Sequence, residues 1–168
     1  MTHYIREVFC ALLTSGVMAS LGAQRDESPA IKIAIIKADD VRCQTQKWDR
    51  FIEVSKKKGV KVSCGIICAS LTTTNKEYKD WLIAQEKSGF IEFWNHGWDH
   101  KKWEKDNATI TEFGASGYAH QKDNFVKAQN AMKDVLGHPA TAFGAPYNRV
   151  DQDTMQVLVE DPSIKLFF

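Results

Sequence analysis

The length, composition and charge of the chain are those of a single globular domain. Of its 168 residues, 43% are hydrophobic, which is enough to form one domain with a sizeable core. The 22 basic and 21 acidic residues leave a net charge of +1. Nucleic acids and anionic membranes attract a strongly basic surface, so this balance predicts neither as a partner.

The N-terminal residues differ from the rest of the chain. An apolar run over residues 8–13 is followed by small residues up to Ala23. The run falls short of the ~20 residues that a membrane-spanning helix needs. It suits a secretory signal peptide that is cut after Ala19 or Ala23. Because Glu7 weakens the positive start of such a peptide, a packing helix or an uncleaved anchor is the alternative.

These features divide the chain into three parts. Residues 1–23 are predicted to be a signal peptide, residues 24–30 a linker, and residues 31–168 one catalytic domain. A secreted or periplasmic protein, with no membrane span in its mature chain, is the expected product. The chain stops inside the apolar run 163–168, which indicates a longer protein that has been truncated.

Apolar runs alternate with helical patterns along the predicted domain. Strands are expected at residues 31–36, 60–71, 90–94, 140–143 and 163–168. Four helices are expected between these strands. The first ends at Gly59, and the second runs from a capping box of Thr74 and Glu77 to Gly89. The third covers Phe125 to Leu136 and stops at Gly137, and the fourth begins at an Asp151 cap and ends before Pro162. The segment from Lys101 to Gly117 is expected to be an irregular polar loop. This alternation predicts an α/β fold with a parallel sheet, either open or closed into a barrel.

Three short motifs lie at the ends of predicted strands. They are residues 37–40 (Lys-Ala-Asp-Asp), 96–100 (His-Gly-Trp-Asp-His) and 143–148 (Phe-Gly-Ala-Pro-Tyr-Asn). Parallel strands present their carboxyl ends at one edge of a sheet, where ligands commonly bind. The motifs are therefore expected to meet there.

The first motif contains adjacent carboxylates, Asp39 and Asp40. Two ionised carboxylates repel each other unless a cation or hydrogen bonds compensate. A metal ion would resolve this by binding one aspartate and leaving the other free to accept a proton. A solvated Asp-Asp turn is the alternative for the pair taken alone.

The second motif places His96 and His100 four residues apart, so that both would face the same way on a helical turn. Imidazole suits zinc, iron, nickel and cobalt. Two histidines and one aspartate leave positions open for water, as in catalytic rather than structural zinc sites. Asp99 would either support a ligating histidine or cap a helix.

In these motifs the chain resembles the polysaccharide deacetylase family (carbohydrate esterase family 4) over residues 31–168. The resemblance implies that Asp39 is the general base and that Asp40, His96 and His100 hold a divalent metal, with zinc expected. It also implies that the backbone N–H of Tyr147 stabilises an oxyanion. The expected fold is then a distorted, incomplete (β/α) barrel of parallel βα repeats.

The third motif departs from the family pattern, in which it reads Arg-x-Pro-Tyr-Gly. Gly144 stands where the family has an arginine that holds the base, and Asn148 stands where it has glycine. We expect Lys37 to replace that arginine, because it lies two residues before Asp39 on the same face of a strand. Snorkelling of Lys37 from the strand end is the alternative.

A second departure concerns the late histidine that serves as general acid in the family. It has no counterpart before Phe168, since His120 and His138 both precede the third motif. Of the aromatic residues near the motifs, Trp98, Trp103 and Tyr147 could stack on sugar rings, whereas Trp94 is expected in the core. The residues expected to bind or support the substrate are Lys37, Trp98, Pro146 and Asn148.

The function implied is that of a metal-dependent hydrolase that removes acetyl groups from N- or O-acetylated saccharides with a metal-activated water. The partner is thus an acetylated poly- or oligosaccharide. One alternative is a non-catalytic, carbohydrate-binding relative. Another is a metal-dependent amidase that acts on small molecules.

Overall fold

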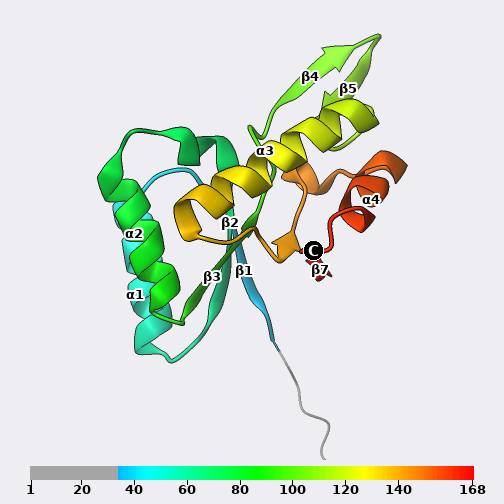
Figure 1. The fold of residues 1–168 in the computed structure, drawn as a ribbon. Helices are drawn as coiled ribbons and strands as arrows, with labels where there is room; N and C mark the ends of the chain where they lie inside the picture. The colour runs from blue at the N-terminus through cyan, green and yellow to red at the C-terminus, as the bar shows by residue number, and fades with distance from the viewer. Residues whose placement is uncertain (1–33) are drawn as a thin grey trace, which may run out of the picture. The chain divides into compact units, whose positions relative to one another are not determined.

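An open, parallel sheet of five strands forms the centre of the domain in the computed structural model, which describes residues 34–168 (Figure 1). The strand order is β1-β2-β3-β6-β7, and every neighbouring pair is parallel. The strands are β1 (Ile36–Val41), β2 (Val62–Ile66), β3 (Ile91–Asn95), β6 (Ala142–Phe143) and β7 (Leu166–Phe167). Over the described residues the sheet does not close, so the predicted α/β fold with an incomplete barrel is confirmed. The predicted signal peptide and the linker at residues 24–30 lie outside this range.

Helices connect the strands as the periodicity predicts. They are α1 (Gln46–Lys57), α2 (Lys76–Lys87), α3 (Tyr118–Leu136) and α4 (Gln152–Val159), with short 3-10 turns η1 (Cys68–Thr72) and η2 (Pro146–Asn148). None of the helices in the described range is long and apolar enough to cross a membrane.

The helix ends confirm two of the predicted caps and correct a third. Gly137 ends α3 with a left-handed φ of 88°, which a residue without Cβ adopts readily. Asp151 accepts the backbone N–H of Thr154 and caps α4. The capping box predicted at Thr74 is wrong, because the cap of α2 is the side chain of Asn75, one residue later. Asparagine caps as well as threonine, so hydrophobic periodicity alone does not choose between neighbours.

Strand β1 lies further along the chain than the apolar run predicts. It begins at Ile36, which pairs with Val62 at the start of β2, and it includes both aspartates of the first motif. The predicted strand over residues 60–71 is also too long, because η1 takes up its last part. Hydrogen-bond pairing with the neighbouring strand determines where each strand begins and ends. The hydropathy pattern of the sequence does not show that pairing.

The segment predicted as an irregular loop contains an antiparallel hairpin of β4 (Lys102–Lys105) and β5 (Ala108–Thr111). Its two turn residues, Asp106 and Asn107, have φ values of 52° and 62°, which two-residue hairpin turns require. The four-residue alternation Ala-Thr-Ile-Thr after the turn is too short to predict a strand by itself. The hairpin extends away from the sheet near the beginning of α3 (Figure 1).

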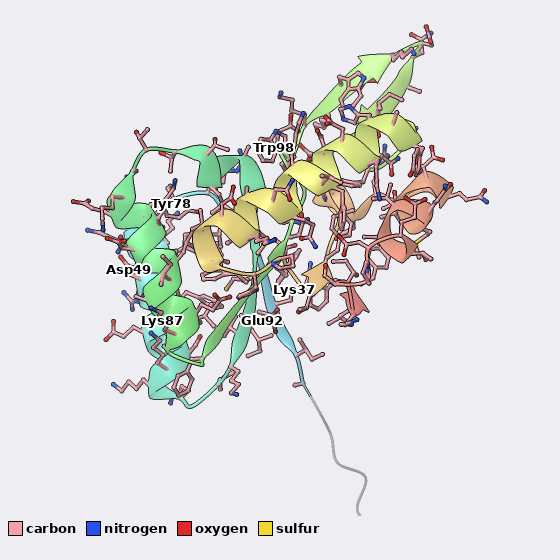
Figure 2. All side chains as sticks on the ribbon, in the orientation of Figure 1. Lys37, Asp49, Tyr78, Lys87, Glu92 and Trp98 are labelled. Carbon is pink, nitrogen blue, oxygen red and sulfur yellow. The ribbon has the colours of Figure 1, made fainter. Side chains whose placement is uncertain are left out.

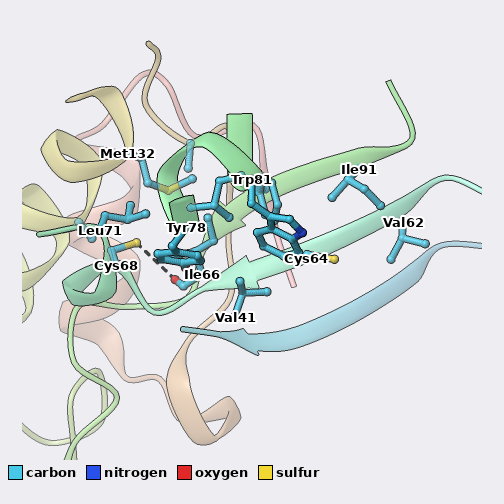
Figure 3. Close-up of a cluster of buried hydrophobic side chains, with 14 of the residues drawn as sticks. Val41, Val62, Cys64, Ile66, Cys68, Leu71, Tyr78, Trp81, Ile91 and Met132 are labelled. Atoms are coloured by element: carbon cyan, nitrogen blue, oxygen red, sulfur yellow. Dashed lines mark hydrogen bonds between the residues drawn. The ribbon is translucent and has the colours of Figure 1, made fainter. Parts of the chain in front are cut away.

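The main core lies between the sheet and three helices (Figure 3). Strand residues Val62, Ile66 and Phe93 pack there with Trp81 of α2 and Met132 of α3. Side chains alternate across a strand, so the residue after Phe93 faces the opposite side of the sheet.

That residue, Trp94, fills the second side of the sheet. Its side chain is fully buried, as predicted, and its ring covers two glycines. A Cβ atom added to Gly65 would lie 2.5 Å from the ring, and one added to Gly144 would lie 2.7 Å away. Gly65 of β2 and Gly144, just after β6, therefore have no room for a side chain beside this indole.

Replacing Gly65 with alanine should destabilise the domain by about 1–3 kcal/mol, because the new methyl group overpacks against Trp94. Denaturant unfolding measures this change in free energy. Ser63→Ala is the control two residues earlier, since the buried Ser63 hydroxyl has no hydrogen-bond partner within the described residues. Equal stability of Gly65→Ala and the parent would contradict the tight contact.

Candidate metal centre

A β-bulge near the end of β1 separates the two adjacent aspartates. Ala38 pairs with Cys64 and Val41 with Ile66, so Asp39 and Asp40 together oppose one residue of β2. A bulge redirects side chains locally. Asp40 accordingly takes a positive φ of 72°, and its carboxylate faces the histidine motif, whereas Asp39 pairs with Lys37.

The histidine motif is an irregular loop that follows β3. The predicted helical turn is wrong, because Gly97 and His100 adopt left-handed φ values of 77° and 57°. Backbone hydrogen bonds hold the loop to β2 and η1, from His96 N to Ile66 O at 2.9 Å and from Cys68 N to Gly97 O at 3.0 Å. The two imidazoles nevertheless lie side by side, with ring centroids 5.1 Å apart.

Asp40, His96 and His100 converge on one point. The Asp40 Oδ1 atom lies 3.6 Å from His96 Nε2 and 3.3 Å from His100 Nε2. One potential ligand atom from each residue lies within 4.8 Å of those of the other two. The spacing and the donor types fit a divalent metal bound by one carboxylate and two imidazoles.

The environment of His96 supports this assignment. Its Nδ1 atom lies 2.6 Å from the Gly144 carbonyl, so Nδ1 carries the proton and Nε2 is free to bind a metal. Burial of the ring lowers the pKa of His96, which outweighs the raising effect of the Gly144 carbonyl and Asp39. A neutral imidazole is the form that binds metal.

The two carboxylate oxygens of Asp39 have different surroundings. Its Oδ2 atom accepts a hydrogen bond from Lys37 Nζ at 2.9 Å, whereas its Oδ1 atom is buried without a hydrogen-bond partner in residues 34–168. Lys37, labelled in Figure 2, also lies over the Trp94 ring, 4.8 Å from its centroid. The lysine is thus held between an aromatic face and the carboxylate.

The third motif turns sharply after β6. Tyr147 and Asn148 adopt left-handed φ values of 60° and 52°, and Pro146 is buried beside the histidine loop. The Tyr147 hydroxyl donates to the His100 carbonyl at 2.9 Å, and the two rings are 4.4 Å apart. The turn therefore contacts the same loop that carries the two imidazoles.

The remaining residues singled out in the sequence have other partners. Trp98 is half-buried and packs partly on the main core (Figure 2). Asp99 bonds to Lys101 and caps no helix, so the capping alternative is wrong. His138 pairs with Glu86 on α2, and His120 packs against Trp103 of the hairpin.

Glu112 is a residue that the motifs did not indicate. Its side chain is fully buried directly behind the histidine loop, where both carboxylate oxygens accept backbone N–H groups. Burial raises the pKa of Glu112 to about 7, although the N–H donors of Trp98 and His100 act to lower it. A lone glutamate after a polar segment gives no sequence signal for such a position.

Comparison with known proteins identifies the family. Residues 26–162 match the sequence profile of the polysaccharide deacetylases. The chain belongs to this family, which is carbohydrate esterase family 4. No curated protein matches its sequence significantly.

Solved structures of this family share the fold. A family 4 carbohydrate esterase from Streptomyces lividans in complex with acetate is 13% identical, with a TM-score of 0.62 over 80% of this chain and 61% of its own. A CE4 family pseudoenzyme from Bacillus anthracis has the same identity, coverage of this chain and TM-score, over 42% of its own length. The CE4 domain of a xylanase from a termite hindgut metagenome (Trinervitermes trinervoides) is 16% identical, with a TM-score of 0.58 over 73% of this chain and 52% of its own. The chain thus spans about half the length of these structures.

Zinc titration of the metal-free chain by calorimetry should show one tight site. His100→Ala and Asp40→Asn should weaken binding by at least about 100-fold, since each removes a ligand directly. His138→Ala is the control, because that imidazole is bonded to Glu86 instead. Unchanged zinc affinity in either ligand variant would contradict the proposed centre.

Proposed function

We propose that the chain is a metal-dependent deacetylase that hydrolyses acetyl groups on N- or O-acetylated saccharides, with zinc as the metal. The observation that carries the proposal is the convergence of Asp40, His96 and His100, with Asp39 beside them and uncommitted at Oδ1. Membership of the polysaccharide deacetylase family supports the substrate class. A zinc ion held by these three residues would lower the pKa of bound water and polarise the acetyl carbonyl.

Each aspartate then has its own task. Asp40 is the ligand, and its 56% exposed side chain opens the centre to solvent. Asp39 accepts the proton of the attacking water, while Lys37 donates a hydrogen bond to its Oδ2 atom and holds the carboxylate in place. The proposal thus explains why adjacent carboxylates need different partners.

The missing arginine of the third motif has a steric explanation. A side chain at Gly144 would collide with Trp94, whose ring lies under Lys37. The cation that orients the base therefore comes from β1 instead of from the third motif. We propose that Lys37 performs this role.

The third motif supplies the support for the substrate in this proposal. Tyr147 presents its backbone N–H to the developing oxyanion, and Pro146 and Asn148 shape the turn that carries it. Trp98 and Tyr147 provide aromatic surface for a sugar ring beside the centre. The Tyr147 side chain is 40% exposed, which leaves room for such stacking.

Replacing Asp39 with asparagine should lower acetate release by ~10²–10⁴, the usual cost of losing a proton-transfer group. The assay uses N-acetylated glucosamine oligomers and O-acetylated xylan with the zinc-loaded chain. Asp123→Asn is the matched control, because Asp123 pairs with Lys127 at an exposed position of α3.

The same assay separates the alternatives. Zinc and glycan binding without acetate release would favour a non-catalytic relative, whereas turnover of small acetamides alone would favour an amidase. Asp39→Asn with the parent rate would contradict the assignment of the base.

Replacing Lys37 with methionine should lower turnover about 10- to 100-fold, because Asp39 loses a charge-assisted hydrogen bond. Lys37→Arg should retain much of the rate. Lys61→Met, at an exposed position just before β2, is the control for loss of one positive charge. Equal rates for Lys37→Met and the parent would show that the lysine only packs on Trp94.

A further inference from the structure

Four hydrogen-bond donors converge on the buried carboxylate of Glu112. Three are the consecutive backbone N–H groups of Trp98, Asp99 and His100, and the fourth is the side-chain amide of Asn124 on α3. The His100 N–H lies 2.7 Å from Oε2, and the Asn124 Nδ2 atom lies 3.2 Å from Oε1. Consecutive N–H groups that point at one anion form a backbone nest, here filled by a side chain of the same chain.

The backbone of Glu112 is itself fixed in place. Its N–H donates to the Lys101 carbonyl at 3.0 Å, and its carbonyl accepts the Ser116 hydroxyl at 2.8 Å. The first of these bonds closes the base of the β4–β5 hairpin. Glu112 therefore lies next to the histidine loop in space, although the whole hairpin separates the two in sequence.

Close contacts restrict the conformation of the histidine loop. A Cβ atom at Gly97 would lie 2.8 Å from Glu112 Oε2 and 2.8 Å from Pro146 Cγ. The loop is thus held between the carboxylate and the third motif. A third contact of the loop is the hydrogen bond that Ala69 N donates to Trp98 O at 2.8 Å.

We propose that Glu112 is a positioning residue that builds the metal centre before any metal binds. By holding the N–H groups of residues 98–100, it orients the His100 imidazole toward Asp40 and His96. Without this carboxylate, three partly buried backbone donors would lose their acceptor, and the left-handed turn at His100 would lose its support. The inference rests on the metal centre of the proposed function and adds a residue outside its motifs.

Glu112→Gln tests the carboxylate with almost no change in volume. One oxygen becomes an NH₂ group, which cannot accept and would face backbone N–H donors. Calorimetric titration of the metal-free chain with zinc should show affinity about 10- to 100-fold below that of the parent. Gln121→Met is the matched control, a buried polar residue of α3 that bonds to Asp151 and Thr154 instead of the loop.

A merely structural role predicts a different outcome from a positioning role. Zinc affinity unchanged in Glu112→Gln, or weakened equally in Gln121→Met, would overturn the inference while leaving the metal centre intact. A parent chain that binds no zinc would instead contradict the proposed function, and the inference with it.

A second measurement uses the parent chain and does not depend on how a variant folds. Hydrogen exchange of the metal-free protein, followed by NMR, should show the amides of Trp98, Asp99 and His100 protected. Exchange at the rate of an unstructured peptide would show that the carboxylate does not hold the loop before the metal arrives.

Discussion

Packing around the Trp94 indole constrains the side of the sheet that carries Lys37 and Gly144. The ring is fully buried, covers Gly65 and Gly144, and supports Lys37 on its face. Because no side chain fits at position 144, the third motif cannot place a cation beside Asp39. The Nζ atom of Lys37 on β1 lies beside Asp39 instead and also over the Trp94 ring. The position of this one core residue thus explains why residue 144 is a glycine.

Strained backbone is concentrated where the proposed ligands and their supports lie. Outside the hairpin turn and Ala115, the positive φ values of residues other than glycine in the described range belong to Asp40, His100, Tyr147 and Asn148. Such conformations cost of order 1–3 kcal/mol each and persist only where surrounding contacts hold them. The bulge in β1, the Glu112 carboxylate and the bond from Tyr147 to His100 are those contacts. These strained residues indicate that the site keeps its geometry at some cost in the folding stability of the domain.

The fold class and the convergence of Asp40, His96 and His100 could be predicted from the sequence for simple physical reasons. Buried parallel strands need apolar runs, and helices on such a sheet need apolar faces, so the alternation was visible. The donors of the metal centre were also visible, because carboxylates and imidazoles at strand ends are chemically conspicuous. Strand boundaries, the cap of α2 and the β4–β5 hairpin were not, since pairing partners and turn conformation decide them.

By itself, the sequence determined the three motifs and the alternation of sheet strands with helices, because these follow from local composition and spacing. Only the tertiary structure decided how the motifs are used. It showed that a bulge, not simple alternation, divides Asp39 from Asp40, and that a loop, not a helical turn, carries the histidines. It alone revealed Glu112, which comes 12 residues after His100 and meets it only because the hairpin folds back. Contacts between residues far apart in the chain leave no local pattern, so they are settled only by folding.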